Sequence, residues 1–99
     1  MDSQIISKLQ EYFKTQPIEK AWIFGSYARG DENNNSDLDI MVEYECGYRP
    51  GLFGISKIME DLKKLIGKNI DLVEKGFLYP LIAKEVEKQK IEIYERANS

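Results

Sequence analysis

Three aspartates are the residues of this sequence whose type and spacing best suit a reaction. Asp37 and Asp39 stand two residues apart in the segment Ser-Asp-Leu-Asp, and Asp71 stands in the segment Asn-Ile-Asp-Leu-Val. Residues two apart on a strand point to the same face of a sheet. Carboxylate oxygens on one polar face suit Mg²⁺, which keeps ligand positions open for substrate phosphates. The spacing therefore predicts a metal site for phosphate chemistry.

Asp71 extends this pattern to another strand, because its apolar neighbours Ile70 and Leu72 would face the core. If that strand lies beside the strand of Asp37 and Asp39, three carboxylates share one face and resist ionising together. A pair of divalent ions removes this repulsion, and it can also activate an attacking oxygen and neutralise a leaving one. We therefore expect two Mg²⁺ ions held by these three acids.

The pair Gly25-Ser26 supplies the second part of the predicted site. A glycine at the end of a strand lets the backbone approach a ligand closely, and a following helix start offers N–H groups to a phosphate. Ser26 adds a hydroxyl and Arg29 a guanidinium that can reach the same phosphate. The Gly-Lys-Ser/Thr ending of a Walker A loop is missing. Phosphate-binding residues combined with metal-binding carboxylates are what nucleotidyl transfer requires.

The elements that position these residues follow from hydrophobic periodicity and from glycine and proline. Helices are expected over residues 3–15, 26–29, 55–66 and from Leu78 to Val86, and strands over residues 20–24, 37–43, 69–74 and 90–94. This alternating order, α-β-α-β-α-β-α-β, predicts an α/β (α+β) fold with a small mixed sheet and flanking helices. The length of 99 residues predicts a single domain over residues 1–99.

Composition excludes several classes of function. The chain has no histidine and one cysteine, Cys46, so triads that use histidine, His-ligated zinc and internal disulfides are not available. The net charge of −3, with scattered Lys and Arg, argues against a grip on long nucleic acid. The sequence shows neither an apolar run long enough for a membrane span nor a signal peptide at its start. We expect a cytoplasmic protein.

Each feature also has a simpler interpretation. Ser-Asp-Leu-Asp alone could be a solvated turn before a strand, and Gly25-Ser26 alone could be a corner between strand and helix. Arg29 could pair with Asp31 or Glu32, Trp22 is expected in the core, and residues 84–90 are expected to form a solvated helix face. The joint occurrence of acids and glycine-serine turn, in order along the chain, favours a catalytic site.

The segment from Gly25 to Asp39 resembles the signature of the DNA polymerase beta-like nucleotidyltransferases: Gly-Ser, a variable stretch, Asp-x-Asp, and a third acid on a later strand. It is most similar to the minimal nucleotidyltransferase group, whose pattern Gly-Ser-x-Ala-Arg-Gly-x5-Ser-Asp-x-Asp occurs here without a gap. Tyr27 stands where many relatives carry Arg, which leaves phosphate contacts more dependent on Arg29. The resemblance covers essentially the whole chain and implies the polymerase beta-like fold.

By this resemblance, Asp37 and Asp39 hold two Mg²⁺ ions, and Asp71 binds the catalytic metal and helps to deprotonate the acceptor hydroxyl. Gly25 and Ser26 bind the β- and γ-phosphates of ATP, with Arg29 as a further contact. The group commonly forms the antitoxin of toxin–antitoxin pairs, beside a HEPN-domain protein that is an RNase. The implied reaction transfers AMP to a tyrosine of that toxin.

Two other functions stay open at this stage. The chain could neutralise a HEPN partner by occlusion, without catalysis, although degenerate acids would then be expected. It could also modify a small molecule, which would require an acceptor pocket formed between two copies of the chain. The nucleotide base, the acceptor and the oligomeric state do not follow from the sequence, and neither does the role of the loop 45–54.

Overall fold

The computed structural model describes residues 2–97. The elements follow one another as α1 (Ser3–Lys14), β1 (Ile18–Phe24), α2 (Ser26–Arg29), β2 (Leu38–Tyr44), α3 (Leu52–Ile66), β3 (Ile70–Glu74), α4 (Pro80–Gln89) and β4 (Ile91–Glu95). This order confirms the predicted alternation of helices and strands. Among these helices, none is long and apolar enough to cross a membrane.

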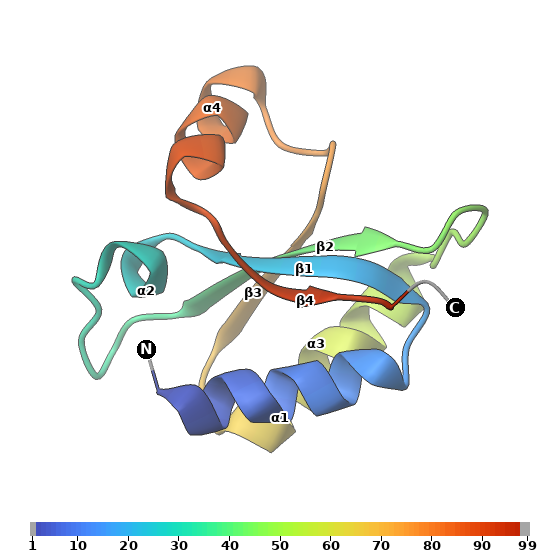
Figure 1. The fold of residues 1–99 in the computed structure, drawn as a ribbon, viewed down its shortest axis with the longest axis horizontal. Coiled ribbons are helices and arrows are strands. Elements are labelled where there is room, and N and C mark those ends of the chain that lie inside the picture. The colour runs from blue at the N-terminus through green and yellow to red at the C-terminus, as the bar shows by residue number, and fades with distance from the viewer. Residues whose placement is uncertain (1, 98–99) are drawn as a thin grey trace.

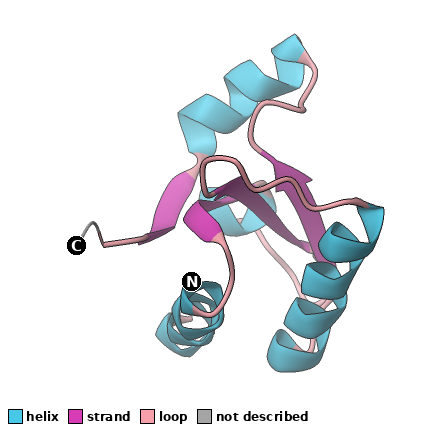
Figure 2. Cartoon of the chain, turned by 90° about the vertical axis from the view of Figure 1, so that its right-hand side faces the viewer, coloured by secondary structure: helices cyan, strands magenta, loops and turns pink. Residues whose placement is uncertain are grey.

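The strands form one four-stranded mixed sheet in the order β3-β2-β1-β4. β1 pairs antiparallel with both β2 and β4, whereas β2 and β3 run parallel. α1 and α3 cover one face of the sheet, and α4 stands on the opposite face (Figures 1 and 2). The parallel connection through α3 brings the segments of Asp39 and Asp71 together, because a crossover helix returns the chain to the same edge of the sheet.

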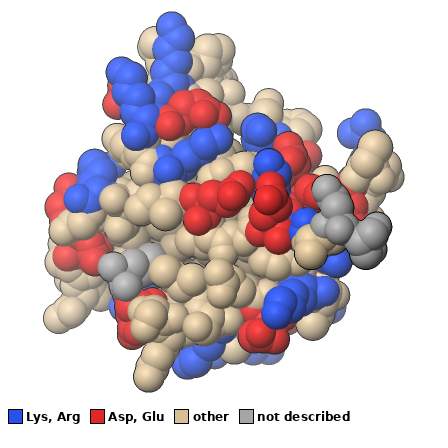
Figure 3. Space-filling model, in the orientation of Figure 1, with Lys and Arg blue, Asp and Glu red and all other residues tan. Residues whose placement is uncertain are grey.

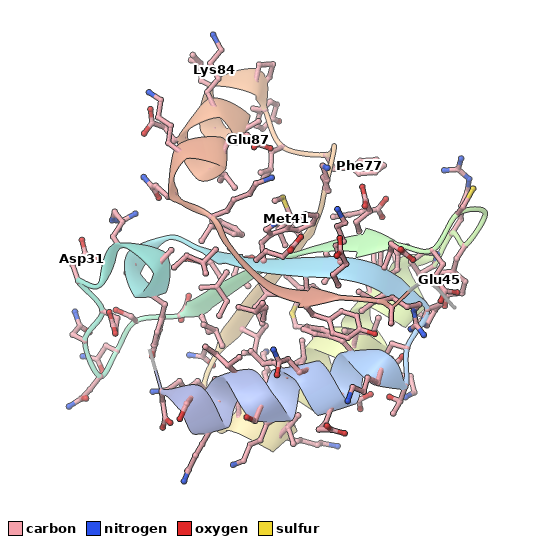
Figure 4. The ribbon with its side chains drawn as sticks, in the orientation of Figure 1. Asp31, Met41, Glu45, Phe77, Lys84 and Glu87 are labelled. Atoms are coloured by element: carbon pink, nitrogen blue, oxygen red, sulfur yellow. The ribbon has the colours of Figure 1, made fainter. Side chains whose placement is uncertain are left out.

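The main core lies between the sheet and the pair α1 and α3. In β2, alternate residues Leu38, Ile40 and Val42 are fully buried in this core. The residue between the last two, Met41, belongs to a smaller cluster with Trp22 and Val86 under α4 (Figure 4). This alternation confirms the predicted direction of the β2 side chains, and it leaves Asp39 on the α4 face, since side chains alternate along a strand.

Local signals explain three of the helix ends. Asp2 caps α1 by accepting a hydrogen bond of 2.8 Å from the Gln4 N–H. α3 ends at Gly67, whose φ of 77° is the left-handed conformation that favours glycine. Pro80 occupies the first position of α4, where its missing N–H costs no helical hydrogen bond.

The boundaries differ from the predictions by one to three residues at several places. β1 begins at Ile18 rather than residue 20, because Ile18 pairs with Tyr44 across the sheet. α3 begins at Leu52 rather than residue 55 and includes Gly54. β2 begins at Leu38, so Asp37 lies just before the strand. Such shifts depend on pairing between distant segments, which local periodicity does not encode.

Candidate active site

Asp39 and Asp71 are register partners on the parallel strands β2 and β3. Directly opposed residues on neighbouring strands place their side chains on the same face of the sheet. Ile70 and Leu72, on either side of Asp71, are buried in the main core, whereas Asp71 itself is exposed. The two carboxylates therefore lie side by side on the α4 face, as the sequence predicted.

Burial raises the pKa of Asp39 to about 6, and the neighbouring Asp71 carboxylate adds to this effect by charge and by hydrogen bonding. Asp37 raises the same pKa further through its negative charge, while the Arg29 guanidinium opposes the shift. A carboxylate beside like charges is stabilised in its protonated form unless a cation compensates. The group of residues around Asp39 therefore has an excess of negative charge.

Gly25 forms the turn that brings the backbone against Asp39. Its φ of 73° lies in the left-handed region, which glycine adopts without a steric cost. A Cβ atom at this position would lie only 3.0 Å from the Asp39 carboxylate carbon. Phe24, the residue before the glycine, is the register partner of Asp39 across β1 and β2. Both the backbone angle and the close approach thus require glycine here.

The short helix α2 follows this turn and carries Ser26 and Arg29. Gly25 is the residue before its first turn, and the Gly25 carbonyl accepts hydrogen bonds from the N–H groups of Ala28 and Arg29. The Arg29 side chain donates to Asp31 at 3.1 Å and to the Gln89 side-chain oxygen at 3.2 Å. The pairing of Arg29 with Asp31 agrees with the simpler interpretation of Arg29, and the contact with Gln89 links α2 to α4.

Asp37 lies one residue before β2, where its charge acts on Asp39. Within residues 2–97, no three His, Cys, Asp or Glu side chains are grouped closely enough to hold a metal ion as they stand. The donor set nevertheless fits a hard divalent cation: carboxylate oxygens from Asp37, Asp39 and Asp71, with excess negative charge around Asp39. The geometry brings Asp39 and Asp71 together and leaves Asp37 at the edge.

Two hollows in the surface differ in their position relative to this group of residues. A hollow of about 440 Å³ is lined by Gly25 and Arg29 together with residues of α4. A larger one, of about 610 Å³, lies among residues 34–36, Lys63 and the α3–β3 turn, and its lining includes neither the three acids nor the Gly25–Arg29 segment. The smaller hollow is therefore the one that adjoins the candidate site.

Sequence reasoning missed Gln89, which lies 60 residues from its contact partner Arg29. It is a polar residue near the end of an amphipathic helix, so nothing in the local pattern distinguishes it from a solvated residue. Trp22, in contrast, is buried as expected, with the ammonium groups of Lys75 and Lys90 at 5.2 and 4.7 Å from its ring centre. Because neighbouring side chains cover the Trp22 ring, it is not available to stack on a nucleobase.

The profile of the family "Polymerase beta, Nucleotidyltransferase" matches residues 7–99. The chain therefore belongs to this family of nucleotidyltransferases. The chain is similar to a solved structure described as a minimal nucleotidyltransferase, which is 27% identical, with a TM-score of 0.72 over 90% of this chain and 88% of that chain. This assignment confirms the resemblance found in the sequence.

Other relatives bear names that concern function. The protein adenylyltransferase MntA of Thermococcus cleftensis is 39% identical over 79 residues, which are 80% of this chain and 75% of the relative. A toxin–antitoxin complex with AMP-PNP contains a chain with a TM-score of 0.79 and 19% identity, over 92% of this chain and 73% of that one. A complex of the tri-AMPylated Shewanella oneidensis HEPN toxin with MNT antitoxin contains a chain with a TM-score of 0.74 and 16% identity, over 97% of this chain and 74% of that chain. At these identities the two complexes show a shared fold.

Proposed function

We propose that this chain transfers AMP from ATP to an acceptor hydroxyl with the help of Mg²⁺, and that the acceptor is a tyrosine of a HEPN-type toxin. The observation that carries the proposal is the pairing of Asp39 with Asp71 on adjacent parallel strands, with the Gly25 turn against Asp39. This arrangement combines a place for cations with a backbone turn open to phosphates. The name of the relative MntA, a protein adenylyltransferase, supports the same activity.

Asp37, Asp39 and Asp71 would hold two Mg²⁺ ions, which when bound neutralise the triphosphate and the leaving pyrophosphate. Gly25 and Ser26 would bind the β- and γ-phosphates through backbone N–H groups and the serine hydroxyl. Arg29, already directed toward α4 by Gln89, would supply a further positive charge beside the phosphates. These roles use every residue that the sequence singled out.

In the proposed reaction the acceptor oxygen attacks the α-phosphorus of ATP. A new oxygen–phosphorus bond forms, and the bond between the α-phosphorus and the bridging oxygen breaks to release pyrophosphate. Asp71, the more exposed acid of the pair, would accept the proton of the acceptor hydroxyl. Because no electrons are exchanged with a cofactor, ATP and the acceptor are the complete set of reactants.

The choice of a toxin as acceptor rests on the neighbouring structures. Their descriptions include a HEPN toxin that carries AMP groups in complex with an MNT antitoxin, and an antitoxin complex with an ATP analogue. A protein acceptor brings its own binding surface, so a chain of this size needs no further pocket for it. On this view the protein silences its partner by modifying it and acts as an antitoxin.

The test is to incubate the protein with Mg²⁺ and α-labelled ATP in an extract of its own host, beside Asp39→Asn. We expect label on one discrete protein with the parent and none with the variant. The exposed acid Glu60 on α3 provides the matched control, because Glu60→Gln removes a charge far from the acids. Transfer by Asp39→Asn at the parental rate would refute the proposal, and label on a small molecule or RNA would change the acceptor.

A second candidate is a non-catalytic antitoxin that covers its partner. It is favoured by large apolar side chains that are exposed near the starts of α3 and α4: Leu52, Phe53, Phe77 and Tyr79. Large apolar side chains that are exposed next to one another in the chain, such as Leu52 and Phe53, can mark a surface for another protein. If a variant with both Asp37→Asn and Asp39→Asn protects cells as well as the parent does, occlusion suffices. If protection is lost while the complex still forms, catalysis is required.

A further inference from the structure

The six tyrosines of this chain differ in how accessible the fold leaves their hydroxyl groups. Tyr27, Tyr44 and Tyr94 are buried, and burial raises the pKa of Tyr44 to about 12. Burial and a hydrogen bond of 2.8 Å donated to Asp61 raise the pKa of Tyr12. A hydroxyl that is enclosed or hard to ionise is a poor nucleophile. These four tyrosines are therefore unsuited to accept a transferred group.

Tyr79 is the most accessible tyrosine in residues 2–97, with 79% of its surface exposed. Tyr48 is 43% exposed, and its ring centre lies 5.7 Å from that of Tyr44. Tyr79 stands directly before α4, between Phe77 and Leu81, which are 75% and 79% exposed. Phe77 lies on the connection from β3 to α4 (Figure 4). The start of α4 therefore presents an accessible phenol flanked by exposed apolar side chains.

The backbone holds Tyr79 in an extended conformation. Its φ of −60° and ψ of 145° are typical of a residue before proline, since Pro80 disfavours the helical region for its neighbour. The Tyr79 carbonyl accepts a hydrogen bond of 2.8 Å from the Ala83 N–H, which fixes the segment to the first turn of α4. An exposed, extended segment can enter the site of another protein molecule without prior unfolding.

Tyr79 and the acids of its own chain lie near opposite ends of α4. Gln89, at the far end, accepts a hydrogen bond from Arg29 at 3.2 Å, and the Arg29 charge acts on Asp39. The ten residues of the helix span on the order of 15 Å. In Figure 1 the start of α4 stands away from the sheet, whereas its end lies next to it. We therefore expect Tyr79 to meet the acids of another copy rather than its own.

Charge favours this encounter between two copies. From Lys75 to Lys84 the sequence is Lys-Gly-Phe-Leu-Tyr-Pro-Leu-Ile-Ala-Lys, with a lysine at each end and no acidic residue. Lys75 pairs with Glu43 at 3.5 Å, and Lys84 is exposed. The residues around Asp39 carry an excess of negative charge, to which ATP would add. Opposite charges on two surfaces accelerate their association.

We propose that Tyr79 of one copy accepts AMP from ATP bound to a second copy of this chain. The inference rests on the proposed function and adds a modification site on the protein itself. The Tyr79 oxygen attacks the α-phosphorus, the bond to the bridging oxygen breaks, and pyrophosphate leaves. Asp71 of the second copy accepts the phenol proton. The product carries a negatively charged phosphodiester at the start of α4, which alters the surface that Phe77 and Tyr79 offer to a partner.

The first experiment separates the acceptor from the enzyme. The untagged parent acts as the enzyme, and a tagged Asp39→Asn chain acts as the acceptor, with Mg²⁺ and α-labelled ATP. We expect label on the tagged chain, located on Tyr79 by peptide mass mapping. The label should be lost in the acceptor Asp39→Asn/Tyr79→Phe and retained in the matched control Asp39→Asn/Tyr48→Phe. Both substitutions remove one hydroxyl and keep the ring, so neither should disturb the fold.

Equal labelling of the tagged chains with and without the Tyr79 hydroxyl would overturn the proposal. Labelling of the parent without labelling of tagged Asp39→Asn would also overturn it, because transfer would then occur within one chain.

The same reaction in host extract separates this inference from the proposed function. If the parent labels a protein of the extract but not the tagged chain, self-modification is refuted while the proposed function stands. If it labels the tagged chain at Tyr79 and no extract protein, the toxin acceptor is refuted while the Tyr79 site stands. An absence of label on every protein would refute both.

A second acceptor variant tests recognition by charge. Lys84→Gln in the tagged chain removes an exposed lysine near Tyr79 and should slow labelling severalfold at low salt. The matched control Lys64→Gln removes an exposed lysine of α3, on the other face of the sheet, and should leave the rate unchanged. Equal rates for these two acceptors would contradict recognition of the Tyr79 segment by charge.

Discussion

Asp39 and Asp71 face the same side of the sheet as direct partners on β2 and β3, and their proximity helps to raise the pKa of Asp39 to about 6. Two negative charges on neighbouring carboxylates destabilise the folded protein unless one of them is protonated or a cation lies between them. The site therefore lowers the free energy of unfolding when no ligand is bound. Evolution commonly retains such a cost where function requires it.

The pH dependence of stability should reveal this cost. Because the pKa of Asp39 is raised in the folded state, the folded protein binds the proton more tightly than the unfolded chain between pH ~4 and ~6. Stability from this group is fully present below that window and is lost as the pH rises through it. Urea unfolding in EDTA should therefore show Asp39→Asn to be more stable than the parent at pH 7.5, by about 1–2 kcal/mol once solvent screening is allowed for.

That difference should narrow toward zero near pH ~3, where Asp39 is protonated in the folded protein and mostly protonated in the unfolded chain. The control Glu11→Gln removes an exposed acid that pairs with Lys14 on α1, and it should change stability by less than about 0.5 kcal/mol. A parent that is more stable than Asp39→Asn at pH 7.5 would show that the Asp39 charge is already compensated.

Ligand binding should reverse the order of stabilities. A ligand that binds only the folded protein raises its free energy of unfolding, by about 2.7 kcal/mol at a concentration of 100 times the dissociation constant. We expect Mg²⁺ with a non-hydrolysable ATP analogue to raise the melting temperature of the parent and not that of Asp37→Asn/Asp39→Asn. Chelation by EDTA should abolish the increase. An equal increase in both proteins would place the cation elsewhere.

The contact of Gly25 with Asp39 can be separated from the cost of backbone strain. Gly25→Ala adds a Cβ at a φ of 73° and within 3.0 Å of the Asp39 carboxylate carbon, whereas Gly30→Ala has a φ of 82° with nothing within 4 Å. Both substitutions should lose about 1 kcal/mol to the unfavourable φ. Gly25→Ala should lose a further 1–3 kcal/mol, roughly, from the clash, and it should also lose AMP transfer.

The double variant Gly25→Ala/Asp39→Ala checks this assignment, because it removes the carboxylate with which the new Cβ collides. Chemical denaturation should show that the second substitution recovers part of the stability lost in Gly25→Ala. Equal losses for Gly25→Ala and Gly30→Ala would mean that the Asp39 side chain moves aside without cost.

Arg96 ties the end of β4 to the connection between α1 and β1. Its guanidinium donates to the backbone carbonyls of Ile18 at 3.1 Å and of Gln16, and it pairs with Glu45 at 2.8 Å. Arg96→Ala should lower the free energy of unfolding by about 2 kcal/mol, since it leaves several carbonyls without a donor. Arg96→Lys should recover little, because an ammonium cannot reproduce the fork of donors.

The control for the Arg96 variants is a substitution in the exposed ion pair of Lys14 and Glu11. Lys14→Ala removes the partner of Glu11 on the surface of α1 and should cost less than about 0.5 kcal/mol. Thermal unfolding of Arg96→Ala, Arg96→Lys and Lys14→Ala would rank the three variants by stability. If Arg96→Ala matches Lys14→Ala, the carbonyls are satisfied by water instead.

The helices, the strands and the identity of the three acids could be predicted from the amino-acid sequence alone. Periodic apolar residues specified helices and strands, since burial repeats every two residues on a strand and every three to four on a helix. The buried trio Leu38, Ile40 and Val42 confirmed the direction of Asp39 for this reason. The uninterrupted pattern from Gly25 to Asp39 indicated the family that the profile then confirmed.

Features that depend on pairing between distant segments became visible only in the folded protein. The register that sets Asp39 beside Asp71, the start of β1 at Ile18, and the contact of Arg29 with Gln89 join residues far apart in the chain. The distribution of charge over the surface also depends on the fold. On the face drawn in Figure 3, acidic and basic side chains are mixed, and no continuous basic stripe is seen. The local pattern predicts on which face of the sheet a residue lies. Which residue of the neighbouring strand lies beside it depends on the strand register, which is set by the packing of the whole fold.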